Sequence, residues 1–335
     1  MAEILNSRLQ ALIDRGYTKE DVLRLSSYTI DEFNEAAHTI FSRITANVTK
    51  NKQPFCLFIG GQPGSGKTCL SMEIKELMNN AIEIGIDNYR TYHPHYLEME
   101  KLIKEHWVNR KETVNDSPGN DIADFTHLFS GAMTDKLIEE AARKDEFGNS
   151  YNILLEWGMR EPTGPLKTMA DLKTKDYQNI VVFVCTHKDT SLLACEVRAN
   201  IMGNDNHIIR KVPQSFHNLC IEQLPESINK IYEYGTSNKI IDDFKLCLRS
   251  GKIIWDNTCQ GLPGNIFNSY LNNFELTKEY INSDLLAFKT DVKEKQGLVD
   301  QVKILEKNKQ RIIYTVNEDL LNSFYDQEYI KQCVK

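Results

Sequence analysis

The segment that decides the fold reads Phe55-Cys-Leu-Phe-Ile-Gly60, followed by Gly61-Gln-Pro-Gly-Ser-Gly-Lys67-Thr68. Its second half fits the pattern G-x-x-x-x-G-K-[ST], and its first half is a short apolar run typical of a buried strand. A helical pattern begins directly afterwards at Cys69. This order of strand, glycine-rich loop and helix predicts a P-loop, which binds nucleotide phosphates, rather than a turn with only a structural role.

Each residue type in the loop has a physical reason. Glycine lets the backbone curl so that several N–H groups point at a phosphate. Lysine adds a point charge on the β and γ oxygens, and a threonine hydroxyl holds Mg²⁺. We therefore expect Thr68 to be the metal contact. The predicted nucleotide-binding residues are Gly61, Gln62, Pro63, Gly64, Ser65, Gly66, Lys67 and Thr68.

Outward from the loop, short apolar runs alternate with helix-length stretches. The runs are typical of buried parallel strands and lie at 54–59, 81–87, 152–155, 179–185 and, more weakly, 252–255. Helical spacing occupies 68–78, 125–143, 165–173 and 191–202. The alternation predicts an α/β protein with a doubly wound parallel sheet of about five strands.

Helices are expected on both sides of this core. Thr18 and Thr29 each stand three residues before an acid, which is the capping-box spacing at a helix start. Apolar spacing extends the second of these helices to Val48, and similar spacing between 298 and 316 predicts a helical tail. We expect a helical lead-in at 1–52, a P-loop core at 53–258 and a helical C-terminal extension at 259–335.

Composition excludes several classes of protein. The 335 residues carry 40 Lys+Arg and 47 Asp+Glu, a net charge of −7, so no general attraction to nucleic acid is expected. The eight cysteines form no C-x-x-C pair and are expected to be reduced packing residues. The start of the chain lacks the apolar stretch of a signal peptide, and no apolar run is long enough to span a membrane. We expect a cytoplasmic protein with no nucleic-acid or membrane partner.

Two carboxylates stand at the ends of expected strands. Asp87 ends the run that starts at 81, and Glu156 follows the run at 153–155. Open α/β sheets bind ligands at the carboxyl ends of their strands. Asp87 is then either a general base that accepts a hydroxyl proton in a kinase reaction, or a helix N-cap or Mg²⁺-shell carboxylate. Glu156 is expected to orient a metal-bound water or a substrate hydroxyl.

Arginines farther along the chain are candidates for closing over a transferring phosphoryl group, because charge stabilisation supplies most of that catalysis. They are Arg160, Arg198 in a helical stretch, and Arg210 in a loop-like segment. For any one of them, a solvated surface position is the simpler interpretation of the sequence alone.

With these residues in place, the chain resembles the zeta-toxin family, P-loop kinases of bacterial toxin–antitoxin systems. The similarity lies in the P-loop, in Ile86-Asp-Asn-Tyr-Arg-Thr-Tyr-His-Pro94, in Leu155-Glu156 followed by Arg160, and in Arg198 and Arg210. The resemblance implies a P-loop kinase-like fold. It also implies ATP- and Mg²⁺-dependent phosphorylation of the 3′-hydroxyl of a sugar nucleotide, UDP-N-acetylglucosamine, and a small helical antitoxin as partner.

By motif position, the resemblance implies a role for each candidate. Asp87 is the base, Lys67 and Thr68 contact phosphate and Mg²⁺, Glu156, Arg160 and Thr168 contact the sugar nucleotide, and Arg198 and Arg210 clamp the phosphates. Two departures concern the acceptor. Gly85 stands where the family often has a second acid, and Trp157-Gly158 stands where it usually has Gly-Thr.

Other functions stay open on the sequence. The acceptor is otherwise a nucleoside or dinucleotide hydroxyl, or the protein is an ATP-binding regulatory module without catalysis. A toxic kinase also needs restraint. Either a separate antitoxin docks near the P-loop with the help of the helix at 31–48, or the tail from about 265 covers the site in cis.

Overall fold

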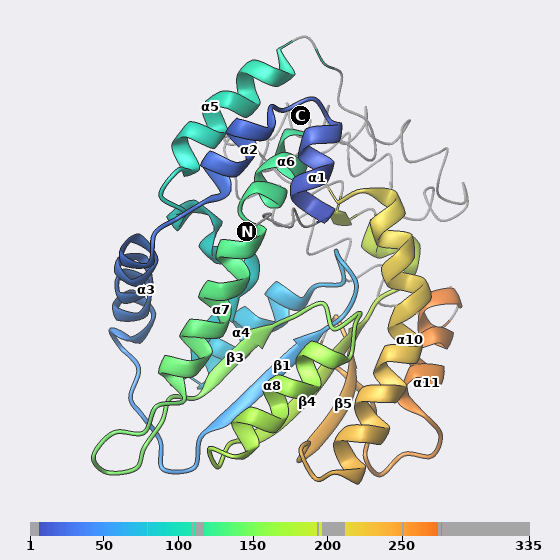
Figure 1. Cartoon of the computed structure of the whole chain (residues 1–335). Helices are drawn as coiled ribbons and strands as arrows, with labels where there is room; N and C mark the ends of the chain where they lie inside the picture. The colour runs from blue at the N-terminus through green and yellow to red at the C-terminus, as the bar shows by residue number, and fades with distance from the viewer. Residues whose placement is uncertain are drawn as a thin grey trace, which may run out of the picture.

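The computed structural model of the chain describes residues 7–78, 80–108, 110, 117–192, 194–195, 212–249, 251–273 and 276. At its centre is a six-stranded sheet with the order β2-β3-β1-β4-β5-β6 (Figure 1). The strands are β1 (Phe55–Gly60), β2 (Ile82–Gly85), β3 (Ile153–Glu156), β4 (Gln178–Cys185), β5 (Asp243–Leu248) and β6 (Ile253–Asp256). The first five run parallel, which confirms the predicted α/β sheet.

Two differences from the sequence prediction lie at one edge of the sheet. Strand β5 was not predicted, because Asp243 and Lys245 interrupt its apolar residues. Strand β6, expected among the parallel strands, pairs antiparallel with β5. The physical reason is the short connection between them, since a parallel pair needs a crossover of a dozen or more residues.

Helices cover both faces of the sheet (Figure 1). One face packs against α3 (Ile30–Thr45), α7 (His127–Ala141), α8 (Thr163–Lys173), α10 (Gln214–Ser237) and α11 (Pro263–Asn272). The opposite face packs against α4 (Lys67–Met78). Each face of the sheet has its own apolar cluster, and alternate residues of β1 belong to different clusters. Cys56 and Phe58 lie in the larger cluster, and Leu57 and Ile59 lie in the smaller cluster beneath α4. Strands buried on both sides need nearly continuous apolar runs, as the sequence has.

A third apolar cluster lies beyond the sheet. It joins α1 (Ser7–Asp14), α2 (Lys19–Ser26), α5 (Tyr96–Trp107) and α6 (Pro118–Phe125), which gather at one end of the molecule in Figure 1. The predicted starts of α2 and α3 are confirmed. Thr18 Oγ1 accepts from the Asp21 N–H, and Thr29 forms a reciprocal capping box with Glu32.

Other predictions meet the structure only in part. The stretch expected to be helical at 125–143 becomes α7, separated from α6 at Thr126. The tail helices expected between 298 and 316, and the last part of the helix expected at 191–202, lie outside the described residues. Within the described part of the chain, no helix combines the length and the apolar character that crossing a bilayer requires.

Candidate active site

The phosphate-binding loop, residues 61–68, connects the end of β1 to the start of α4. Gly61, Gly64 and Gly66 have φ values of +140°, +75° and +97°, a region that L side chains rarely adopt. The curled backbone brings the Lys67 Nζ to the carbonyl oxygens of Gly61 and Gln62, at 3.0 and 2.9 Å. The amide groups at the start of α4 form the positive end of that helix, so the loop is built to receive phosphate.

The segment after β4 braces this loop from the side. The Gln62 Nε2 donates to the Thr186 carbonyl at 2.6 Å, and the Thr186 hydroxyl donates to the Ser65 carbonyl at 2.8 Å. A Cβ on Gly64 would lie 2.0 Å from the carbonyl oxygen of Ser191, so only glycine fits there. Sequence reasoning did not assign Thr186 or Ser191 to the loop, because both reach it only through the fold.

Glu156 lies where the ends of three strands meet. It pairs with Ile59 of β1 and with Gly85 of β2 in the strand register. The Thr68 hydroxyl donates to Glu156 Oε2 at 3.1 Å. The other oxygen, Oε1, is buried and has no hydrogen-bond partner among the described residues. Burial raises the pKa of Glu156, and the nearby Lys67 ammonium acts in the opposite direction.

These observations test whether the residues suit Mg²⁺. The Thr68 hydroxyl and the Glu156 carboxylate are hard oxygen ligands, which Mg²⁺ prefers, and one carboxylate oxygen is buried without a partner in the described part of the chain. A buried carboxylate of this kind is stabilised in its ionised form by a cation. The donor set therefore fits a magnesium ion held beside the phosphate-binding loop.

Asp87 lies in the first turn of the 3-10 helix η1 (Ile86–Tyr92), directly after β2. The N-cap of η1 is Gly85 and makes no side-chain capping bond, so Asp87 is not the N-cap that the sequence left open. The Asp87 side chain is 58% exposed. Its Oδ1 accepts from Arg90 Nε at 2.9 Å and from Arg90 Nη2 at 2.6 Å. Asp87 therefore offers an accessible carboxylate at the same edge of the sheet as Glu156.

The remaining substrate contacts predicted from the sequence, Arg160 and Thr168, lie in or just before α8. Arg160 donates to Gln223 Oε1 of α10 at 2.6 Å, and its guanidinium lies 5.8 Å from the centre of the Phe216 ring. Thr168 is half-buried in the middle of α8. Trp157 follows Glu156 and lies against Gly164, where a Cβ would come within 3.2 Å of the indole. The structure thus brings Arg160 to α10 and does not pair it with Glu156.

The two predicted clamp residues, Arg198 and Arg210, lie outside the described residues. A third arginine, which sequence reasoning missed, does lie at the loop. A Cβ on Gly66 would come within 2.7 Å of Arg249 Cγ and 2.9 Å of Arg249 Nε. Arg249 directly follows β5, so the unrecognised strand also concealed this cation.

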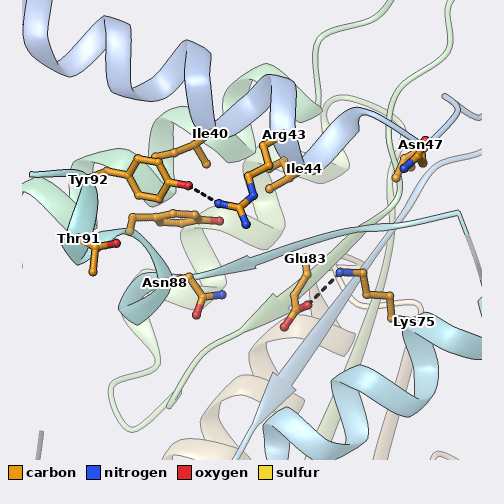
Figure 2. Close-up of a pocket in the computed structure, with 11 residues that line it drawn as sticks. Ile40, Arg43, Ile44, Asn47, Lys75, Glu83, Asn88, Thr91 and Tyr92 are labelled. Carbon is orange, nitrogen blue, oxygen red and sulfur yellow. Dashed lines mark hydrogen bonds and ion pairs between the residues drawn. The ribbon is translucent and has the colours of Figure 1, made fainter. Parts of the chain in front are cut away.

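A pocket of about 580 Å³ opens between α3 and η1, at the outer edge of β2 (Figure 2). On its wall, Arg43 Nη1 donates to the Tyr92 hydroxyl at 3.1 Å. Lys75 pairs with Glu83 at 3.3 Å on the opposite side. The pocket touches Asn88, the neighbour of Asp87, but its lining in the described structure includes none of the site residues predicted from the sequence.

The sheet order, the phosphate-binding loop after β1 and the helices on both faces define a P-loop kinase-like fold. A model of the zeta toxin family matches residues 38–258, and the chain belongs to this family. The resemblance drawn from the motifs is thereby confirmed.

Individual relatives agree with this assignment. The toxin PezT of Streptococcus pneumoniae serotype 4 is 27% identical over 221 residues, covering 65% of this chain and 79% of the relative. A toxin zeta of Streptococcus agalactiae is 25% identical over 229 residues, covering 68% and 71%. Among solved structures, one from the PezAT chromosomal toxin–antitoxin system of S. pneumoniae has a TM-score of 0.62 at 20% identity. It covers 87% of this chain and 99% of that one, and this likeness describes the fold.

Proposed function

We propose that this protein is an ATP- and Mg²⁺-dependent kinase that phosphorylates the 3′-hydroxyl of UDP-N-acetylglucosamine and acts as the toxin of a toxin–antitoxin pair. One observation carries the proposal. The phosphate-binding loop, Glu156 and Asp87 all lie at the carboxyl ends of β1, β3 and β2, which are neighbours in the sheet. The site for a phosphate donor and a proton acceptor thus lie together at the carboxyl ends of these strands.

The donor side uses charge. ATP phosphates lie against the loop amides and the start of α4, and Lys67 exchanges its loop carbonyls for the β and γ oxygens. Thr68 and Glu156 would hold Mg²⁺, which when bound would supply positive charge against the phosphates. By family position, Arg198 and Arg210 close over the transferring group.

The acceptor side uses Asp87. Its carboxylate accepts the proton of the sugar hydroxyl as that oxygen attacks the γ phosphorus, and ADP leaves on the opposite side. The new bond joins the hydroxyl oxygen to phosphorus, and the bond that breaks joins phosphorus to the β–γ bridging oxygen. Arg160 and Thr168 are proposed to contact the sugar nucleotide; Glu156, for which the resemblance implied the same contact, is proposed to hold the metal instead. Trp157 replaces a smaller family residue in this part of the site.

The proposed partner is a small helical antitoxin. Its support is the family assignment, together with the similarity in fold to a protein of the PezAT toxin–antitoxin system of S. pneumoniae. Expression of the full chain tests this role. If the full chain arrests growth and Asp87→Ala relieves the arrest, a separate antitoxin is required. If the full chain is harmless and becomes toxic only after the residues beyond 265 are deleted, the tail is the inhibitor.

Substrate identity is tested by mass spectrometry. Purified protein is incubated with ATP, Mg²⁺ and a panel of UDP-sugars, nucleosides and dinucleotides. We expect a gain of one phosphate on UDP-N-acetylglucosamine and none on its 3′-deoxy analogue. If phosphate is found on a nucleoside or dinucleotide instead, that compound is the acceptor and the proposed sugar nucleotide is not. If the protein binds ATP but forms no phosphorylated product, it is a regulatory module.

A further inference from the structure

We propose that Arg90 is a positioning residue that couples the orientation of Asp87 to helix α6. The inference rests on the proposed function, in which Asp87 is the base. It adds a residue and an element to that function. The C-terminal end of α6 lies outside every motif considered so far, and it becomes part of the support for catalysis.

Arg90 divides its guanidinium between two groups of acceptors. Nε and Nη2 donate to Asp87 Oδ1 at 2.9 and 2.6 Å. Nη1 donates to the Ala123 carbonyl and to the Thr126 hydroxyl, each at 2.9 Å. The side chain of Arg90 is only 11% exposed, whereas that of Asp87 is 58% exposed. A buried, planar cation therefore fixes a carboxylate that would otherwise rotate in solvent.

The acceptors on α6 are themselves well placed for a cation. Ala123 lies in the last turn of α6, where carbonyl oxygens point out of the helix and carry its negative dipole end. The Thr126 hydroxyl is fully buried and donates to the Ile122 carbonyl at 2.6 Å, so its lone pairs face Arg90 in a fixed direction. Lysine has one donor centre and cannot reach both groups at once.

Helix α6 is in turn held by residues between α1 and α2 and by the end of α5. Asp121 is completely buried and accepts from the Tyr17 hydroxyl at 2.6 Å and from the Trp107 indole at 2.7 Å. Arg15 pairs with Asp121 at 2.8 Å and with Asp124 at 2.6 Å. Arg15 and Tyr17 lie between α1 and α2, before the part of the chain that the family model matches, yet they anchor the helix that holds Arg90.

The test compares Arg90→Lys with a matched control, Arg43→Lys. Arg43 braces the other end of η1 through Tyr92, away from Asp87. Since displacement of a reacting group by about 1 Å costs up to ~10²-fold, we expect Arg90→Lys to lower kcat about 10- to 100-fold. The Kd of Arg90→Lys for ATP should stay within about twofold of the wild-type value. Arg43→Lys should leave both kcat and the Kd for ATP unchanged.

Two further measurements separate positioning from a general loss of structure. In an Asp87→Asn background, Arg90→Lys should change the residual kcat less than about threefold, because its effect passes through the carboxylate. Thr126→Val removes one acceptor of Arg90 at constant shape and should also lower kcat, whereas Thr126→Ser, which keeps the hydroxyl, should not.

The outcomes distinguish this inference from the function it rests on. If Asp87→Asn alone keeps full kcat, Asp87 is not the base and the proposed function fails together with the inference. If Asp87→Asn lowers kcat as predicted but Arg90→Lys keeps full kcat, or lowers kcat by the same factor in both backgrounds, Arg90 is a structural residue only and the inference is wrong.

Discussion

The hydroxyl of Thr68 donates a hydrogen bond to Glu156 Oε2 across 3.1 Å, joining the start of α4 to the end of β3. The two residues are far apart in sequence, and the parallel pairing of β1 with β3 brings them together. The predicted metal contact of the loop thus faces a carboxylate whose second oxygen is buried and finds no partner among the residues described. Such a carboxylate costs stability while it is ionised and without a cation.

Glu156→Gln should therefore change the pH dependence of stability. Burial raises the pKa of Glu156 in the folded protein above its pKa in the unfolded chain. The stability of the wild type therefore falls as pH rises from the unfolded-state pKa to the folded-state pKa. Glutamine does not titrate and still accepts from Thr68. We expect the variant to gain stability relative to wild type between about pH 4 and about pH 7.5. Urea unfolding at both pH values measures this, and an equal difference at both would contradict it.

Gly64→Ala should destabilise the protein by about 2–4 kcal/mol, from a left-handed backbone and a steric clash. Its φ is +75°, and the new Cβ would lie 2.0 Å from the carbonyl oxygen of Ser191. Gly131→Ala is the control. Gly131 lies in α7, and apart from its chain neighbours and the backbone of its own helix no described atom lies within 4 Å of an added Cβ, so alanine there should stabilise by about 0.5–1 kcal/mol. Thermal unfolding of both variants checks the opposite signs; a stable Gly64→Ala would contradict the described loop.

Tyr17→Phe should cost about 1–3 kcal/mol, because it leaves the buried Asp121 carboxylate without one of its donors. The matched variant is Tyr234→Phe. Tyr234 is 55% exposed, so the loss of its hydroxyl should change stability by less than about 0.5 kcal/mol. Denaturant titrations of the two variants make the comparison. Equal stabilities would mean that α1 and α2 do not depend on Asp121.

Lys67→Ala should lower kcat by about 10²- to 10³-fold or more, because a preorganised charge on the β and γ oxygens is lost. The loop itself should survive, since its contacts with Thr186 do not involve the ammonium. ATP hydrolysis or product formation gives the rate, and circular dichroism checks the fold. Wild-type turnover in the folded variant would disprove the nucleotide site.

Local and periodic signals in the sequence predicted much of this fold. The P-loop pattern, four of the parallel strands and the starts of α2 and α3 depend on neighbouring residues, and all are confirmed. Strand β5 was missed because its charged residues break the apolar run. Without β5, the short connection that makes β6 pair antiparallel with it could not be recognised either.

The site was less accessible to sequence reasoning for a physical reason. Lys67, Thr68, Asp87 and Glu156 belong to motifs, whereas their supports do not. Thr186 braces the loop from after β4, Arg249 reaches it from after β5, and Ala123 and Thr126 hold Arg90 through a carbonyl and a hydroxyl. These contacts join residues that only the folded chain brings together, and a backbone carbonyl leaves no trace in a motif.

The most direct test of the central claim measures ATP affinity and product formation on the same preparation of Asp87→Asn. Asparagine keeps the size of the side chain and cannot accept the proton. We predict that the Kd for ATP stays within about twofold of wild type, while kcat with UDP-N-acetylglucosamine falls about 10²-fold or more. Weakened ATP binding with unchanged turnover would contradict the claim, because Asp87 would then belong to the nucleotide and metal site and not to the transfer of the proton.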